Sequence, residues 1–262
     1  MKNIIAQMRV FASLLYWDWS MLRRLLASRC INTCVWVIVN TVIAGYVLPV
    51  LGVTQQFGAF IVAGLCGSMG FFELYGRVIE LVRDMTHDKP LLYFATLPIS
   101  LPLFVMRLII GNAMSSTMTT LCVFPCGKLV LGSGLDLSGV NWFLLVPFLL
   151  LVNILYGAAA VVMGGYIKDL VYVSNVWIRI AYPMWFMGCY QFSFQILNEA
   201  LPFIAFLNRF NPIVYIFEGV RALIMGQQGF LPIEQCFFVT FVFCIVFIVW
   251  SVRLIRRRLD LI

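Results

Sequence analysis

The chain has 262 residues, of which 63% are hydrophobic and 11% are charged, and it carries a formal net charge of +7. Soluble globular domains carry roughly 25% charged residues, so this composition excludes a soluble fold and predicts an all-α polytopic membrane protein. Most Lys and Arg residues flank apolar runs, which is typical of signals for membrane orientation and argues against a nucleic-acid-binding face.

The N-terminal stretch 2–28 is predicted to be an amphipathic helix lying in the inner headgroup layer. Its apolar residues recur near helical spacing, and Trp17 and Trp19 suit a membrane interface. The alternative is a seventh span, which Arg9 and Asp18 disfavour because both would be charged within it.

Six membrane spans are predicted, since each span needs about 20 apolar residues. No charged residue lies between Arg29 and Glu73, which leaves room for two spans, and Pro49 and Gly52 mark the turn between them. The six spans cover residues 30–51, 57–80, 103–125, 141–163, 170–193 and 233–254. We expect residues 1–262 to form a single transmembrane domain.

The basic residues predict the orientation of these spans. Segments on one side hold 14 Lys and Arg residues, whereas segments on the other side hold 3. Because basic residues accumulate in cytoplasmic loops, both termini are predicted to be cytoplasmic, in a multi-pass protein of the inner (plasma) membrane.

The connection between spans two and three, residues 83–100, is the most polar internal segment. It is much longer than a connection requires, so it is predicted to dock a cytoplasmic partner. The candidate contact residues are Arg83, Asp84, His87, Asp88 and Lys89. The alternative is an ordinary solvated loop.

Residues 194–228, between spans five and six, are too short for two spans and too apolar for a solvated loop. They predict a helical hairpin that enters the outer leaflet and borders a pathway. Asn211 suits the N-cap of its second limb and Pro212 the first turn. Glu218 and Arg221 are three residues apart and share a face of that limb.

Arg179 is the one basic residue deep within a predicted span, so it is a candidate pathway residue together with the aromatic residues Tyr182 and Trp185. Two other interpretations of Arg179 remain: it pairs with Glu73 or Glu80 of span two, or span five begins later and Arg179 lies at the inner interface. The aromatic residues have an alternative role in an interfacial belt.

Several short motifs, taken in this order along the chain, are similar to those of a known family. They are the "LPIS" stretch (Leu97–Ser100), the Lys168–Asp169 pair after span four, and the "NP…EG.R" element that begins at Asn211 and Pro212. The chain resembles the membrane (permease) subunit of a type-2 ABC exporter, the kind that exports polysaccharides, glycolipids or amphipathic drugs.

The resemblance implies a transport subunit that is not itself an enzyme. ATP and Mg²⁺ would be bound by two separate ATPase subunits, and two copies of this chain would surround one pathway in the bilayer. The segment 83–100 would sit on the ATPase, with Lys168 and Asp169 contributing to that interface. Many relatives carry a Glu and a Gly-Thr pair where this chain has "DKPLLYFA".

The alternative function is an ion-coupled secondary transporter or a channel. Such proteins need ionisable residues near the membrane midplane. The predicted spans put Glu73, Arg77 and Glu80 near the inner end of span two instead. The chain has a single histidine, His87, and no CxxC motif, so neither a metal site nor a catalytic site is expected.

Overall fold

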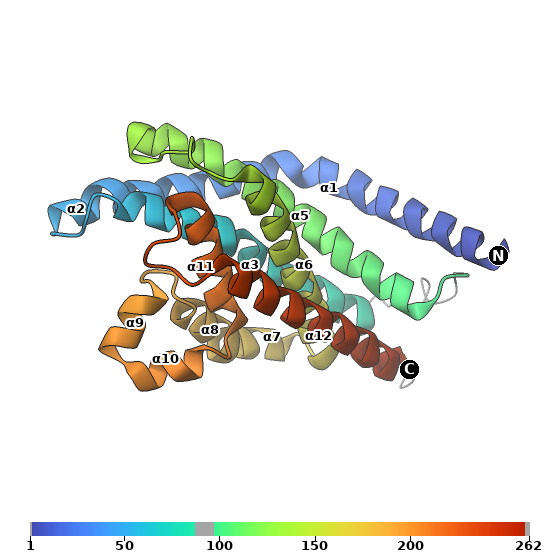
Figure 1. Ribbon diagram of the computed structural model, residues 1–262. Helices are drawn as coiled ribbons and strands as arrows, with labels where there is room; N and C mark the ends of the chain where they lie inside the picture. The colour runs from blue at the N-terminus through green and yellow to red at the C-terminus, as the bar shows by residue number, and fades with distance from the viewer. Residues whose placement is uncertain (1, 87–96, 260–262) are drawn as a thin grey trace.

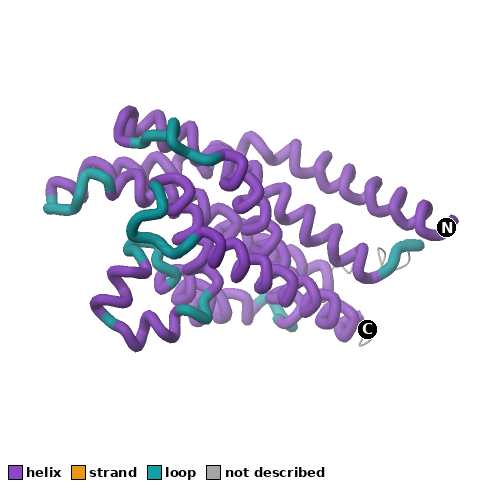
Figure 2. Tube along the Cα trace, in the orientation of Figure 1, coloured by secondary structure: helices purple, strands orange, loops and turns teal. Residues whose placement is uncertain are grey.

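A computed structural model describes residues 2–86 and 97–259 of the chain. Helices account for the regular structure in this part of the chain, and it contains no strand (Figure 2). Five of these helices are long and apolar enough to cross a membrane, judged by length and composition. The chain is therefore a multi-pass membrane protein.

The first helix, α1, runs without a break from Lys2 to Val42 and continues through a π-helical turn (Ile43–Val47) into the short α2 (Leu48–Val50). The prediction that 2–28 forms a helix separate from span one is wrong. Residues 2–42 contain neither Gly nor Pro, so nothing in the local sequence interrupts the helix.

Four further long helices correspond to predicted spans. They are α3 (Phe57–Thr86), α5 (Leu101–Leu131), α6 (Trp142–Tyr166) and α12 (Ile233–Leu259). The starts of α3 and α12 match the prediction, but both helices extend past their predicted ends because their charged final turns remain helical. The central helix is α3, since 78% of its most apolar stretch is buried, compared with 22% for α1 and α12.

The predicted fifth span, 170–193, is shorter than expected. It consists of α7 (Val171–Val176), a π-helical segment η3 (Trp177–Ala181) and α8 (Tyr182–Met187), which have six, five and six residues. This falls below the roughly 20 residues that a span needs. The helix ends at Met187, and Cys189 adopts a positive φ of 71°, which turns the chain away from the helix axis.

The predicted outer hairpin contains three helices instead of two: α9 (Phe194–Ala200), α10 (Pro202–Asn208) and α11 (Pro212–Met225). The short helices α9 and α10 form a corner away from the termini (Figure 1). Residues 212–224 of α11 are all buried, and α11 packs against α3, α6 and α12.

The described bundle has two distinct ends. The N- and C-termini lie at the same end, which we call the terminal end (Figure 1). Arg258 of α12 donates hydrogen bonds to the carbonyls of Gly165 and Ile167, and Leu81 of α3 packs on Gly164, so α3, α6 and α12 all end there. The opposite end carries α2, α9 and α10.

Candidate functional site

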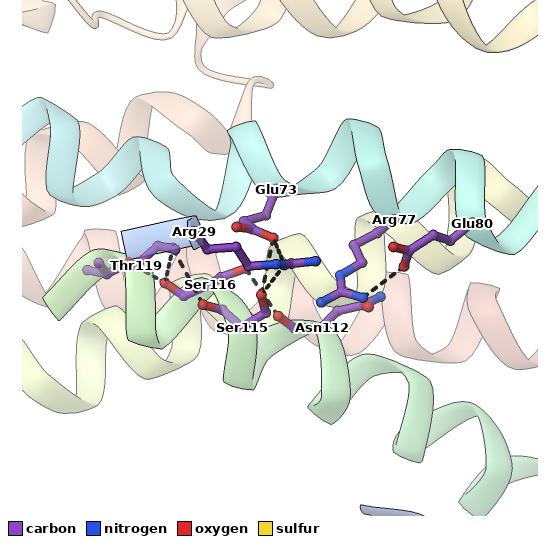
Figure 3. Close-up of polar contacts among 9 residues, drawn as sticks. Arg29, Glu73, Arg77, Glu80, Asn112, Ser115, Ser116 and Thr119 are labelled. Carbon is purple, nitrogen blue, oxygen red and sulfur yellow. Dashed lines mark hydrogen bonds and ion pairs between the residues drawn. The ribbon is translucent and has the colours of Figure 1, made fainter. Parts of the chain in front are cut away.

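A cluster of polar side chains joins α1, α3 and α5 inside the bundle (Figure 3). Arg29 of α1 forms an ion pair with Glu73 of α3. The Arg29 Nη1 also donates to Ser115 Oγ of α5 at 2.5 Å, and Ser115 Oγ donates to Glu73 Oε2 at 3.1 Å. About a fifth of each charged side chain is exposed, so the cluster is accessible from the surface of the single chain.

Glu73 lies near the middle of its helix. At 1.5 Å per residue it is about 24 Å from Phe57 and about 20 Å from Thr86, the two ends of α3. Span two was predicted to end at residue 80, whereas α3 continues to Thr86, 13 residues beyond Glu73. An acidic residue with a basic partner therefore lies near the middle of this 30-residue helix.

Two pockets meet at this cluster. The first, which we call the polar pocket, has a volume of about 430 Å³ and is lined by Arg29, Glu73, Asn32, Thr119 and Tyr182, among others. The second, the charged pocket, has a volume of about 500 Å³. It is lined by four basic and three acidic side chains, namely Arg29, Arg77, Arg83, Arg107, Asp18, Glu80 and Asp84.

Arg29 lines both pockets, so the two adjoin at this side chain, between α1, α3 and α5. We call the lining of both pockets, together with Ser115, the polar track. It begins among the charged side chains near the terminal end and continues past the Arg29–Glu73 pair toward Tyr182.

A second ion pair, within the lining of the charged pocket, attaches α1 to α5. Arg107 Nε donates to Asp18 Oδ2 at 2.7 Å, and Arg107 Nη2 donates to Asp18 Oδ1, which makes the pair bidentate. The Arg107 side chain is only 6% exposed. Arg77 pairs with Glu80 on the same helix at 2.8 Å, and the Glu80 side chain is 46% exposed. Opposite charges in this pocket are thus largely matched.

Glu218 of α11 is fully buried and binds backbone N–H groups. Its Oε1 accepts from the N–H of Phe194, at the start of α9, at 2.9 Å, and its Oε2 accepts from the N–H of Leu231, ahead of α12, at 3.1 Å. Glu218 shares a helix face with Arg221 as predicted, yet none of the hydrogen bonds or ion pairs found in residues 2–86 and 97–259 joins the two side chains.

Arg221 is also fully buried and binds carbonyl groups. Its guanidinium donates to the carbonyls of Cys189, Tyr190 and Phe192, in the irregular segment after α8, and to the carbonyl of Phe60 in α3. It also lies 3.5 Å from the centre of the Phe60 ring, a cation–π contact. Arg221 therefore holds the end of α8 against α3.

Two asparagines complete these contacts. Asn211 accepts from the N–H of Ile213 at 3.1 Å, so the predicted N-cap is confirmed, and it donates to the carbonyl of Met184 at 2.7 Å. Asn208 donates to the carbonyl of Met187. We call Asn208, Asn211, Glu218 and Arg221 the α11 clamp, because each satisfies backbone groups where helices α8, α9 and α11 begin or end.

The predicted pathway residues differ in their surroundings. Arg179 is exposed, and its proposed pairing with Glu73 or Glu80 is wrong because these acids pair with Arg29 and Arg77. Tyr182 lines the polar pocket. Trp185 is buried, donates to Ser68 Oγ at 3.2 Å and stacks on Tyr190, so in the single chain it is a packing residue.

The predicted partner-docking residues lie partly within the described structure. Arg83 and Asp84, near the end of α3, line the charged pocket. Lys168 and Asp169 are exposed in the connection between α6 and α7, at the terminal end. The remaining candidates, His87, Asp88 and Lys89, lie outside the described residues.

The sequence reasoning missed Arg29 and Ser115 as site residues and did not pair Asp18 with Arg107. A usable signal was the polar run Ser115–Thr120 within a predicted span, because such residues face a partner helix or a polar cavity more often than lipid. Among the described residues, no group of three or more His, Cys, Asp or Glu side chains is arranged to hold a metal ion.

The chain was also compared with known proteins. It matches no protein-family model and no curated protein. The functional interpretation therefore depends on the geometry described above and on the motifs in the sequence.

Proposed function

We propose that this chain is the membrane subunit of an ATP-driven exporter of the type-2 ABC class. Two copies would surround a pathway for a polysaccharide, a glycolipid or an amphipathic drug. Two separate ATPase subunits would bind at the terminal end and supply ATP and Mg²⁺.

The observation that carries this proposal is the continuity of α3. At the terminal end α3 carries Arg83 and Asp84, which belong to the proposed ATPase-docking segment. In its first turns it contacts Arg221 through the Phe60 carbonyl and ring. A displacement of the terminal end of α3 would thus reach the α11 clamp through a single unbroken helix, most of whose residues are buried.

The attachment of α1 supports an opening movement. Most of α1 is exposed, and two ion pairs, Arg29–Glu73 and Asp18–Arg107, add to its apolar packing against α3 and α5. An ion pair can exchange its partner for water or for a charged group of the substrate. Separating a close-packed apolar contact is harder, because it exposes the buried surface. We propose that α1 moves away from α5 during transport and opens the polar track.

Purification of the tagged chain from its native membrane in a mild detergent tests this proposal. We expect an ATPase subunit to co-purify and its ATP hydrolysis to depend on this chain. Simultaneous reversal of charge at Arg83 and Asp84 would uncouple hydrolysis from transport while the protein still inserts. The matched control is Arg209→Glu, an exposed arginine between α10 and α11. Export that continues without ATP would contradict the proposal.

The second candidate is an ion-coupled secondary transporter, and the partly buried Arg29–Glu73 pair near the middle of α3 favours it. In that case Glu73 would bind and release a proton or cation as α1 moves. Proteoliposomes separate the two candidates: uptake driven by a pH gradient without ATP, and lost in Glu73→Gln, would support the secondary transporter and exclude the exporter.

A further inference from the structure

A third pocket, which we call the apolar groove, is separate from the polar track. It has a volume of about 430 Å³ and lies where η3 and α8 stand apart from α6 and α12. One wall follows α6 from Leu155 to Ile167, and the others come from α3, α11, α12 and the α7–α8 segment. Ile180 and Trp250 border the groove and are 54% and 45% exposed, so it opens sideways to the surface.

The lining of the groove favours an apolar ligand over a polar one. None of its lining residues is charged. The hydroxyl of Tyr156, at the deep end, is buried and has no hydrogen-bond partner among the described residues. Apart from the hydroxyls of Tyr156 and Tyr166 and the indole N–H of Trp250, the lining side chains are apolar. A polar ligand would lose most of its hydration for few partners, whereas an apolar chain would gain buried area. In a membrane protein the acyl chains of the bilayer are the apolar chains that reach such an opening.

The length of the groove fits one leaflet. The wall from Leu155 to Ile167 covers 12 helical steps, which is about 18 Å at 1.5 Å per residue. Half of a hydrocarbon core of about 30 Å is about 15 Å. One acyl chain of a single leaflet thus reaches from one end of the groove to the other.

Basic residues surround the shallow end of the groove. Lys168 directly follows Ile167, the last lining residue, and is exposed. The bonds from Arg258 to the carbonyls of Gly165 and Ile167 bring the last turns of α12 to the same place. These turns also carry the exposed residues Arg253, Arg256 and Arg257. Asp169 is the acid beside Lys168, so the positive charge predominates and attracts an anionic headgroup.

We infer that the apolar groove binds one acyl chain of an anionic phospholipid, with its headgroup phosphate beside Lys168 and the last turns of α12. The lipid fills the space between α8 and the α6–α12 pair. This inference does not depend on the proposed transport function, because it requires only that the chain lies in a bilayer.

Photolabelling of the whole protein in lipid nanodiscs tests this inference. The probe is phosphatidylglycerol with a diazirine in one acyl chain, and phosphatidylcholine with the same chains is the zwitterionic comparison. We expect the label in residues 155–167 and 176–184, and more of it from the anionic lipid. Labelling spread evenly over the exposed residues of α12 would show annular lipid only and would overturn the inference.

Two variants sharpen the test. Ile180→Trp at the opening and Ala159→Trp inside are each expected to lower labelling of the groove roughly tenfold. This is the loss of affinity expected when the larger side chain keeps about two methylene groups of the acyl chain out of the groove. The matched control is Ile245→Trp, an exposed α12 residue away from the lining, which should change nothing. Lys168→Glu should remove the headgroup preference. If labelling is equal for the two lipids and unchanged by Lys168→Glu, the assignment of an anionic lipid is contradicted.

Discussion

Charged side chains lie inside the bundle in two regions, and they are held in different ways. In the α11 clamp, Glu218 and Arg221 are fully buried and bind backbone groups of irregular segments. In the polar track, Arg29 and Glu73 bind each other and a hydroxyl, are partly exposed, and border two pockets.

We expect this difference to separate charges that stabilise the fold from charges that take part in transport. A side chain whose partners are fixed backbone groups cannot change partners without unfolding the segments it holds. A side chain whose partner lies on another helix exchanges it when that helix moves. We therefore expect substitutions in the α11 clamp to affect stability first, and substitutions at the Arg29–Glu73 pair to affect transport first.

Loss of Arg221 should give the largest effect on stability. Arg221→Ala leaves buried carbonyls without a donor, so we expect a destabilisation of about 3–5 kcal/mol. Arg221→Lys should rescue little, because one ammonium cannot reach all of these carbonyls. Thermal unfolding in detergent measures this, with Arg209→Ala as the exposed control. Equal stability of Arg221→Ala and the unaltered protein would remove the structural role of the clamp.

The Asp18–Arg107 pair should give the next largest effect. Arg107→Ala removes the bidentate partner of the Asp18 carboxylate, which is largely buried. We expect the free energy of unfolding to fall by about 3 kcal/mol. A double-mutant cycle with Asp18→Ala should show that the double variant is less destabilised than the sum of the single variants. Arg77→Ala is the matched control, because its partner Glu80 is nearly half exposed. Additive effects would mean that the pair does not attach α1.

The Arg29–Glu73 pair should affect transport more than stability. We expect Glu73→Gln to cost about 1–2 kcal/mol in unfolding free energy, because the pair is partly exposed. Transport should fall roughly tenfold or more as the balance between open and closed α1 shifts. Ser116→Ala removes a hydroxyl that bonds the Asn112 carbonyl of its own helix and serves as the control. Loss of stability with unaltered transport would assign this pair to the structural class.

Arg179 should give the smallest effect on stability. It is exposed and forms no ion pair with Glu73 or Glu80, so Arg179→Ala should change the unfolding free energy by less than about 0.5 kcal/mol. A fall in the export of anionic substrates by this stable variant would support a pathway role. Failure of Arg179→Ala to assemble would show that it has a structural partner in the complex.

The sequence by itself determined those features that depend on neighbouring residues. The apolar composition required a membrane protein, and the start of α3 at Phe57 and of α12 at Ile233 follows from where apolar runs begin after turn residues. The N-cap at Asn211 also followed from two adjacent residues. Such signals are local, since helix starts and caps depend on a few residues in sequence.

Only the tertiary structure decided which charges meet. Asp18 and Arg107 are 89 positions apart, and Arg29 and Glu73 are 44 apart, so no local pattern pairs them. Glu218 and Arg221 are three positions apart, yet each turns to a different backbone segment. Inside an apolar bundle a charged side chain pairs with the polar group that helix packing places close to it, because leaving the charge unpaired costs several kcal/mol. Packing of α1 against α3 and α5 therefore created the polar track, which the sequence contains only as scattered residues.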